Sequence, residues 1–156
     1  MKDSPNAADG AEQAADQLSE RFATGVVAPF AHIHPITILA QRCHQAALDN
    51  GWWDARIKLM GIAKEAGLEK EMKALVMIAC HGLICSEAGE AMDNIREGWA
   101  PDDKLPDVSG EEAETADIII RALDRAGLAG WDIGATIERK LEVNRKRGVR
   151  HGGKLA

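Results

Sequence analysis

Residues 70–97, KEMKALVMIACHGLICSEAGEAMDNIRE, form the longest run with helical periodicity in this 156-residue chain. With successive side chains about 100° apart, one narrow face of the run collects apolar groups, namely Met77, Cys80, Ile84, Ala88, Ala91 and Ile95. Such a stripe is typical of an amphipathic helix that packs against other helices. The run therefore predicts a long helix, which Gly98 ends.

Boundary signals predict further helices at about 35–50, 54–66, 109–126 and 132–147. Pro35 suits a first helical turn, and the Asn-Gly pair at 50–51 ends that helix. Asp54 and Asp132 are the expected N-caps of the second and last of these helices. With no credible strand, the pattern predicts an all-α fold, a bundle of four to five helices that oligomerises through helix packing.

The helix over 109–126 carries the clearest start signal. Ser109 and Glu112 form an S-x-x-E capping box, and the helix is expected to end before Gly127. Its expected core stripe consists of Ala113, Ala116, Ile119, Ile120 and Leu123.

Composition and charge place the chain in a broad class. Cys43, Cys80 and Cys85 match no disulfide framework, which predicts free thiols. No signal peptide or membrane span is expected, so the protein is predicted to be cytoplasmic. Residues 1–28 are interpreted as a flexible leader and residues 29–156 as one domain. The net charge of −6 is uneven: residues 139–156 hold seven Lys or Arg against one acid, a basic tail on an acidic body.

Acidic side chains interrupt two of the predicted helices beside their apolar faces. Glu87 and Glu90 lie one turn apart on the first, and Glu114 and Asp117 repeat the spacing on the next. Four carboxylates at close range need protons or cations between them. Oxygen-only ligands suit Mg²⁺, and Mn²⁺ would also fit. The alternative is that both pairs lie on solvated helix faces.

The last predicted helix adds two polar residues to this pattern. Lys140 and Asn144 share the sector of Ile133 and Ile137, which predicts that they face inward. Near a polyphosphate they would supply a charge and a hydrogen bond. The alternative for Lys140 is a stem along the surface with its ammonium in water, or an ion pair with one of the acids.

Three segments together resemble a known family. They are SEAGEAMDNIREG, EEAETADIIIRALD and IERKLEVNRKRGVRHGGK, and they are similar to the MazG-like all-α nucleoside triphosphate pyrophosphohydrolases, especially small members from phages and bacteria. The family signature is E-x-x-E, E-x-x-D, then Lys and Asn, which here fall on Glu87, Glu90, Glu114, Asp117, Lys140 and Asn144. The resemblance covers about residues 35–154, although the segment 54–72 is longer than the simplest family pattern.

The resemblance implies a Mg²⁺-dependent enzyme that converts a nucleoside triphosphate to the monophosphate and pyrophosphate. It implies that all four acids hold the metal and that the protein is a homodimer or homotetramer. Glu87 or Glu90 would orient or deprotonate the attacking water, and the sequence does not choose between them.

Other residues are candidates for substrate binding. Trp52 and Trp53 could stack on a nucleobase, or pack a loop against the core. Arg147 and Lys154 could reach phosphates, or belong to a disordered basic end. Two alternatives stay open for the whole chain: a non-catalytic helical interaction module, and a related pyrophosphohydrolase acting on a phosphoribosyl nucleotide or nucleotide conjugate. A nucleic acid partner is not expected.

Overall fold

A computed structural model describes residues 34–147 of the chain. Within this range the protein forms helices and no strand, so the predicted all-α class is confirmed. The helices are α2 (Pro35–Asp49), α3 (Asp54–Glu65), α4 (Glu69–Arg96), α5 (Gly110–Ala129) and α6 (Ile133–Lys146). The predicted leader, and Lys154 in the basic tail, lie outside the described residues.

Local hydrogen bonds explain why several helices start where they do. The Ser109 hydroxyl accepts a hydrogen bond from the N–H of Glu112 at 3.2 Å, which confirms half of the predicted capping box. Asp132 caps α6 by accepting from the N–H of Ala135 at 3.2 Å, as predicted. The prediction that Asp54 caps α3 is wrong, because Trp53 occupies that position without a side-chain hydrogen bond.

The predicted end of α5 before Gly127 is also wrong. The helix continues to Ala129 and ends at Gly130, whose left-handed backbone (φ 62°) suits glycine. Gly127 lies inside the helix at a close crossing with α2. A Cβ atom there would come within 2.4 Å of the backbone oxygen of Ala40 and 2.7 Å of the Cβ of His44. The glycine therefore permits the α2–α5 contact.

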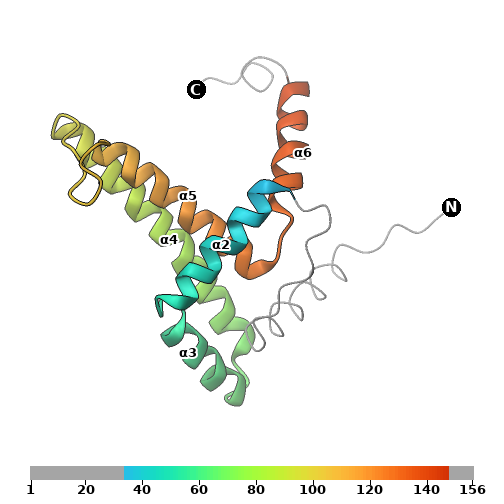
Figure 1. Ribbon diagram of the computed structural model, residues 1–156. Helices are drawn as coiled ribbons and strands as arrows, with labels where there is room; N and C mark the ends of the chain where they lie inside the picture. Colours follow the sequence, from blue (N-terminus) through green and yellow to red (C-terminus); the bar gives the residue numbers. More distant parts are fainter. Residues whose placement is uncertain (1–33, 148–156) are drawn as a thin grey trace.

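The helices are arranged around one antiparallel pair (Figure 1). α4 and α5 run side by side and are joined at one end by the loop over 97–109. α2 crosses α5, α3 packs beside the N-terminal half of α4, and α6 packs on α2 and points away from the pair. The outer end of the α4–α5 pair and α6 therefore project separately from the body.

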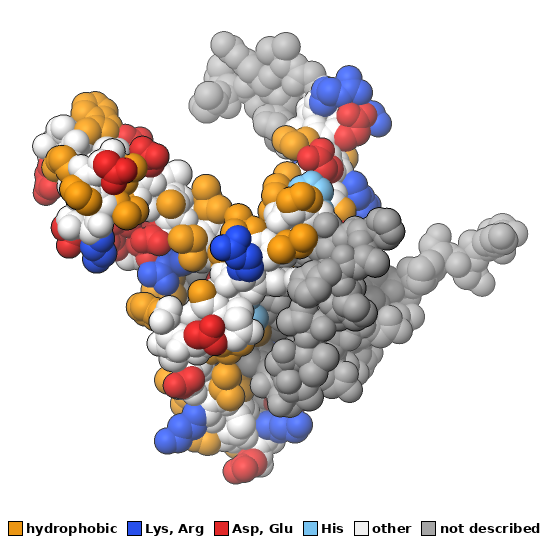
Figure 2. All heavy atoms as spheres, viewed as in Figure 1, with side chains coloured by type: hydrophobic (Ala, Val, Ile, Leu, Met, Phe, Trp, Pro, Cys, Tyr) orange, Lys and Arg blue, Asp and Glu red, His pale blue; other side chains and the backbone are white. Residues whose placement is uncertain are grey.

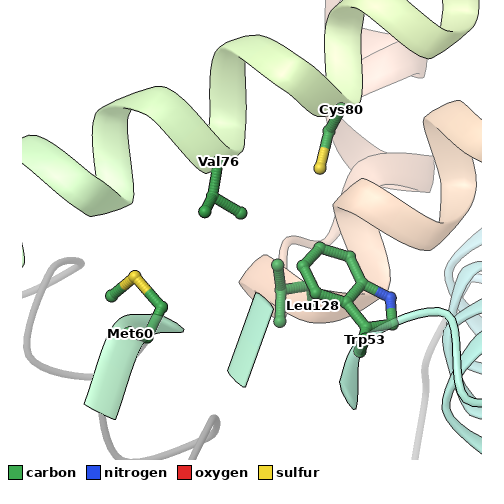
Figure 3. Packing of buried hydrophobic residues seen from close by; sticks show 5 residues of the cluster. All are labelled: Trp53, Met60, Val76, Cys80 and Leu128. Carbon is green, nitrogen blue, oxygen red and sulfur yellow. The ribbon is translucent and has the colours of Figure 1, made fainter. Parts of the chain in front are cut away.

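Two small clusters of buried residues hold this arrangement together. The larger joins α3, α4 and α5 and consists of Trp53, Met60, Val76, Cys80 and Leu128 (Figure 3). The second lies at the α2–α5 crossing and consists of Ala40, Leu123 and Ala126. The core is thus concentrated where α2 and α3 meet the paired helices, and the predicted free state of all three cysteines is confirmed.

Much of the predicted apolar surface of α4 and α5 stays open in the single chain. Ile119 and Ile120, expected in the core stripe of α5, are 52% and 45% exposed. Ile78 on α4 is 67% exposed, and on the outer part of the α4–α5 pair exposed apolar side chains lie among acidic ones (Figure 2). The prediction that these isoleucines of α5 are buried is therefore wrong for one chain by itself. Open apolar area of this kind is typical of surfaces that bind another protein.

Among the described residues, one helix, α4, is long and apolar enough to cross a membrane. The core helices of water-soluble proteins pass the same test, and only 22% of the apolar window in α4 is buried. This is weak support for a membrane location, and the cytoplasmic location stays a prediction.

Candidate metal and substrate site

Three carboxylates converge where α4 packs against α5. Glu87 and Glu90 come from α4 and Glu114 from α5, and one oxygen from each lies within 4.8 Å of the others. Glu87 is buried, Glu114 half-buried and Glu90 exposed, so the group opens to solvent on one side. The predicted convergence of acids from two helices is confirmed for these three residues, which we call the acid cluster.

Asn94 fixes the register that brings the acid cluster together. Its side chain accepts a hydrogen bond from the N–H of Glu111 at 2.9 Å and donates one to the carbonyl of Ala100 at 3.0 Å. A Cβ atom on Gly110 would come within 2.3 Å of the Asn94 amide, so the start of α5 lies directly against α4. Because Glu114 lies one turn further along α5, this contact sets the position of Glu114 along the helix axis relative to Glu90.

Asp117, the fourth predicted ligand, lies beside the acid cluster and is not one of its three converging groups. Its charge is among those that raise the pKa of Glu114. Its side chain also lines the neighbouring pocket. Asp117 therefore connects the acid cluster with the space available to a ligand.

The guanidinium of Arg121 offsets part of the negative charge of the acid cluster, and the crowding of carboxylates raises the pKa of Glu114. The Nε of Arg121 donates to a carboxylate oxygen of Glu87, in an ion pair whose side chains are 30% and 6% exposed respectively. Burial, a hydrogen bond with Glu87 and the charges of Glu90, Glu87 and Asp117 raise the pKa of Glu114. The sequence pattern did not single out Arg121, although it lies one turn after Asp117, where a basic partner is common.

The acid cluster fits a hard divalent cation. All its ligand atoms are oxygens, which Mg²⁺, Ca²⁺ and Mn²⁺ prefer. Ligand oxygens around one Mg²⁺ lie roughly 3–4 Å apart, so the observed limit of 4.8 Å requires only small side-chain movements. The donor set does not distinguish Mg²⁺ from these other ions.

A pocket of about 690 Å³ is linked to the acid cluster through Arg121, which lines the pocket and pairs with Glu87; the three acids themselves do not line it. Arg42 and Cys43 of α2, Arg56 of α3 and Leu83 of α4 contribute to its wall. From α5 and the α2–α3 turn it is lined by Asp117, Ile120, Arg121, Asp124 and Trp52. Its volume lies within the usual range for small-molecule sites, and its wall combines apolar and charged groups.

The two neighbouring tryptophans have different positions. Trp52 is 60% exposed and lines the pocket, with the guanidinium carbon of Arg121 5.8 Å from its ring centroid. Trp53 is fully buried, and its Nε1 donates to the Asp124 carboxylate at 3.1 and 3.2 Å. The prediction that Trp53 stacks on a nucleobase is therefore wrong, and its structural alternative, packing against the core, is observed. Trp52 stays a candidate for base contact.

Asp124 lines the pocket and also ties together the helices that form its wall. Besides the Trp53 indole, it contacts the Nδ1 of His44 at 2.7 Å, which ties α5 to α2. The ring of His44 also meets that of Trp53 edge to face, with centroids 5.7 Å apart. These contacts hold the α2–α3 turn in place, so they also position Trp52.

α6 holds the predicted phosphate-binding residues away from the acid cluster. Lys140 and Asn144 are exposed, and α6 packs mainly on α2, not on the α4–α5 pair. The prediction that they face inward is therefore wrong for one chain by itself. Arg147 follows the end of α6 and is exposed as well.

The comparisons with known proteins add no relative. No protein-family model, curated protein or solved structure matches this chain.

Proposed function

We propose that this protein is a Mg²⁺-dependent nucleoside triphosphate pyrophosphohydrolase that releases a nucleoside monophosphate and pyrophosphate. The observation that carries the proposal is the convergence of Glu87, Glu90 and Glu114, together with a ligand-sized pocket whose wall includes Arg121, the ion-pair partner of Glu87. The MazG-like resemblance adds the substrate class and the bond that is cleaved. A deoxynucleoside or non-standard nucleoside triphosphate is the expected substrate.

The acid cluster would hold the metal, with Mn²⁺ as a possible replacement, and Asp117 would complete the ligands from the pocket side. A bound divalent ion supplies a water of lowered pKa and offsets charge on the phosphoryl group. Among the protein groups, Glu87 is engaged by Arg121 and Glu114. Glu90 is exposed, with a long 3.3 Å hydrogen bond from Ser86, so it is better placed to orient or deprotonate a water.

The pocket would bind the nucleoside end of the substrate. Trp52 presents an exposed indole at its wall, which can stack on a base of any type. Arg42 and Arg56 bring positive charge to the same wall and would favour the phosphate chain. The pocket thus offers both a flat apolar contact and cationic groups next to the acid cluster.

A second copy of the chain would complete the site. Lys140 and Asn144 are exposed on a helix that projects from the body, and Leu141 and Val143 beside them are exposed apolar groups. A homodimer or homotetramer would cover these groups and place Lys140 and Asn144 near the acids of another chain. Open isoleucines on α4 and α5 support the same conclusion.

The open apolar surface equally suits a non-catalytic helical interaction module, which is the second candidate. Such a module would bind its partner without any effect of Mg²⁺ or nucleotides on its stability. A pyrophosphohydrolase for phosphoribosyl nucleotides or nucleotide conjugates would instead require Mg²⁺ but would not hydrolyse nucleoside triphosphates.

The decisive experiment measures pyrophosphate and monophosphate together, with Mg²⁺ and a panel of standard and modified nucleoside triphosphates. Glu87→Gln and Asp117→Asn are each expected to lower the rate by at least about a hundredfold while the helical content is kept. Glu71→Gln, an exposed glutamate at the start of α4, is the matched control and should keep full activity. Full activity in both site variants would refute the site, and release of orthophosphate would indicate another cleavage position.

A further inference from the structure

Arg121 contacts both halves of the candidate site. On one side it donates to Glu87, which is buried within the acid cluster. On the other it lines the pocket, where its guanidinium lies over the ring of Trp52 at 5.8 Å from the centroid. A single side chain therefore joins the proposed metal ligands to the proposed substrate space.

The ion pair between Arg121 and Glu87 conflicts with a cation at the acid cluster. Glu87 directs a carboxylate oxygen at the guanidinium, and a carboxylate oxygen occupied in this way is a poorer metal ligand. A divalent ion held by Glu87, Glu90 and Glu114 would also place like charges at close range. Because the Arg121 side chain is 30% exposed, it has room to leave, whereas Glu87 does not.

We propose that Arg121 exchanges partners, holding Glu87 before metal binds and a phosphate group of the ligand afterwards. The proposal rests on the metal-dependent function given above. Released from Glu87, the guanidinium stays at the pocket wall, where Asp117 lies one helical turn before it and Arg42 and Arg56 line the same space. The planar guanidinium can bind two phosphate oxygens at once, which an ammonium cannot. Arg121 would therefore make phosphate binding dependent on prior metal binding.

The first test measures Mn²⁺ binding without nucleotide, from the electron paramagnetic resonance signal of the free ion. Arg121→Gln removes the competing cation, so it should bind Mn²⁺ about tenfold more tightly than the wild type. Arg145→Gln is the matched control, because it removes the same charge from an arginine–glutamate pair on α6. The control should keep the wild-type affinity for Mn²⁺.

The second test follows Trp52 and the phosphate group. Mg²⁺ should change the fluorescence of Trp52 in the wild type, and the change should vanish in Trp52→Phe and in Arg121→Gln. At saturating Mg²⁺, calorimetry should show that Arg121→Gln binds inorganic pyrophosphate about tenfold more weakly. If Arg121 had only a structural role, Arg121→Gln would leave the Mn²⁺ affinity, the response of Trp52 fluorescence to Mg²⁺ and the pyrophosphate affinity unchanged.

The outcomes separate this proposal from the proposed function. If the wild type binds Mn²⁺ but Arg121→Gln binds it no more tightly than Arg145→Gln, the exchange is refuted and the metal site stands. If the wild type binds no Mn²⁺, both proposals fail. Should Arg121→Gln not fold, Arg121→Lys decides, because lysine holds a carboxylate less firmly. Wild-type Mn²⁺ affinity and an unchanged Trp52 response in Arg121→Lys would overturn the exchange.

Discussion

Gly127 permits a close contact between α2 and α5, and Gly127→Ala should separate these two helices. The added Cβ would lie 2.4 Å from the carbonyl oxygen of Ala40, about 1 Å inside a normal contact distance. That oxygen belongs to the backbone of α2, so no side-chain rotation relieves the clash. Overpacking of this kind costs ~1–3 kcal/mol, and the separation would also loosen Leu123 and Ala126 in the small core cluster. After the ~1 kcal/mol that alanine gains in a helix is subtracted, we expect a net loss of about 1 kcal/mol.

The change is measured as the urea midpoint, followed by circular dichroism at one fixed protein concentration. Gly61→Ala is the control, because Gly61 lies in α3, is exposed, and an added Cβ would meet nothing within 4 Å. It should stabilise the protein by ~1 kcal/mol. Since the pocket is lined from both α2 and α5, Gly127→Ala should also weaken nucleotide binding. If Gly127→Ala is as stable as Gly61→Ala, the reasoning about the helix crossing is wrong.

Two further predictions concern α6. If Lys140 acts from a second copy, a refolded mixture of the inactive Glu87→Gln and Lys140→Ala chains should regain about a quarter of wild-type activity. About half of the randomly formed dimers contain one chain of each kind, and in each of these one of the two sites is intact. No recovery of activity would exclude this arrangement. Hydrogen bonds from the hydroxyl of Thr37 and the N–H of Ala135 hold the pKa of Asp132 below its ordinary value. The stability of the wild type relative to Asp132→Asn should therefore be greatest above pH about 4 and fall as the pH drops through the folded pKa, and a difference independent of pH between 6 and 3 would contradict this.

The helix boundaries follow largely from local sequence. Pro35, Ser109 and Asp132 start helices as predicted, because caps and first turns depend on hydrogen bonds between residues two to four positions apart. The role of Gly127, by contrast, depends on a helix that is distant in sequence. Glycine is a common helix end, and nothing local distinguishes it from a glycine kept small for a helix packed against it.

The positions of the four acids likewise depend partly on local sequence and partly on tertiary contacts. Helical spacing alone places Glu87 and Glu90 on one side of α4, since one turn separates them. Their meeting with Glu114 was expected from two similar motifs, but the exclusion of Asp117 from the closest group was not. The register between α4 and α5 decides it, and that register depends on the contact of Asn94 with Glu111.

Local sequence patterns were sufficient to predict the helices of residues 34–147, their extent to within a few residues, and the acids that could hold a metal. The tertiary structure decided which side chains meet: Arg121 pairs with Glu87, Trp53 is buried while Trp52 faces the pocket, and Lys140 stays exposed. The physical reason is the distance along the sequence between the residues that interact. Helix formation is governed by neighbours within about four residues, whereas distances between side chains of different helices depend on crossings fixed by distant contacts, and on surfaces that a second chain would cover.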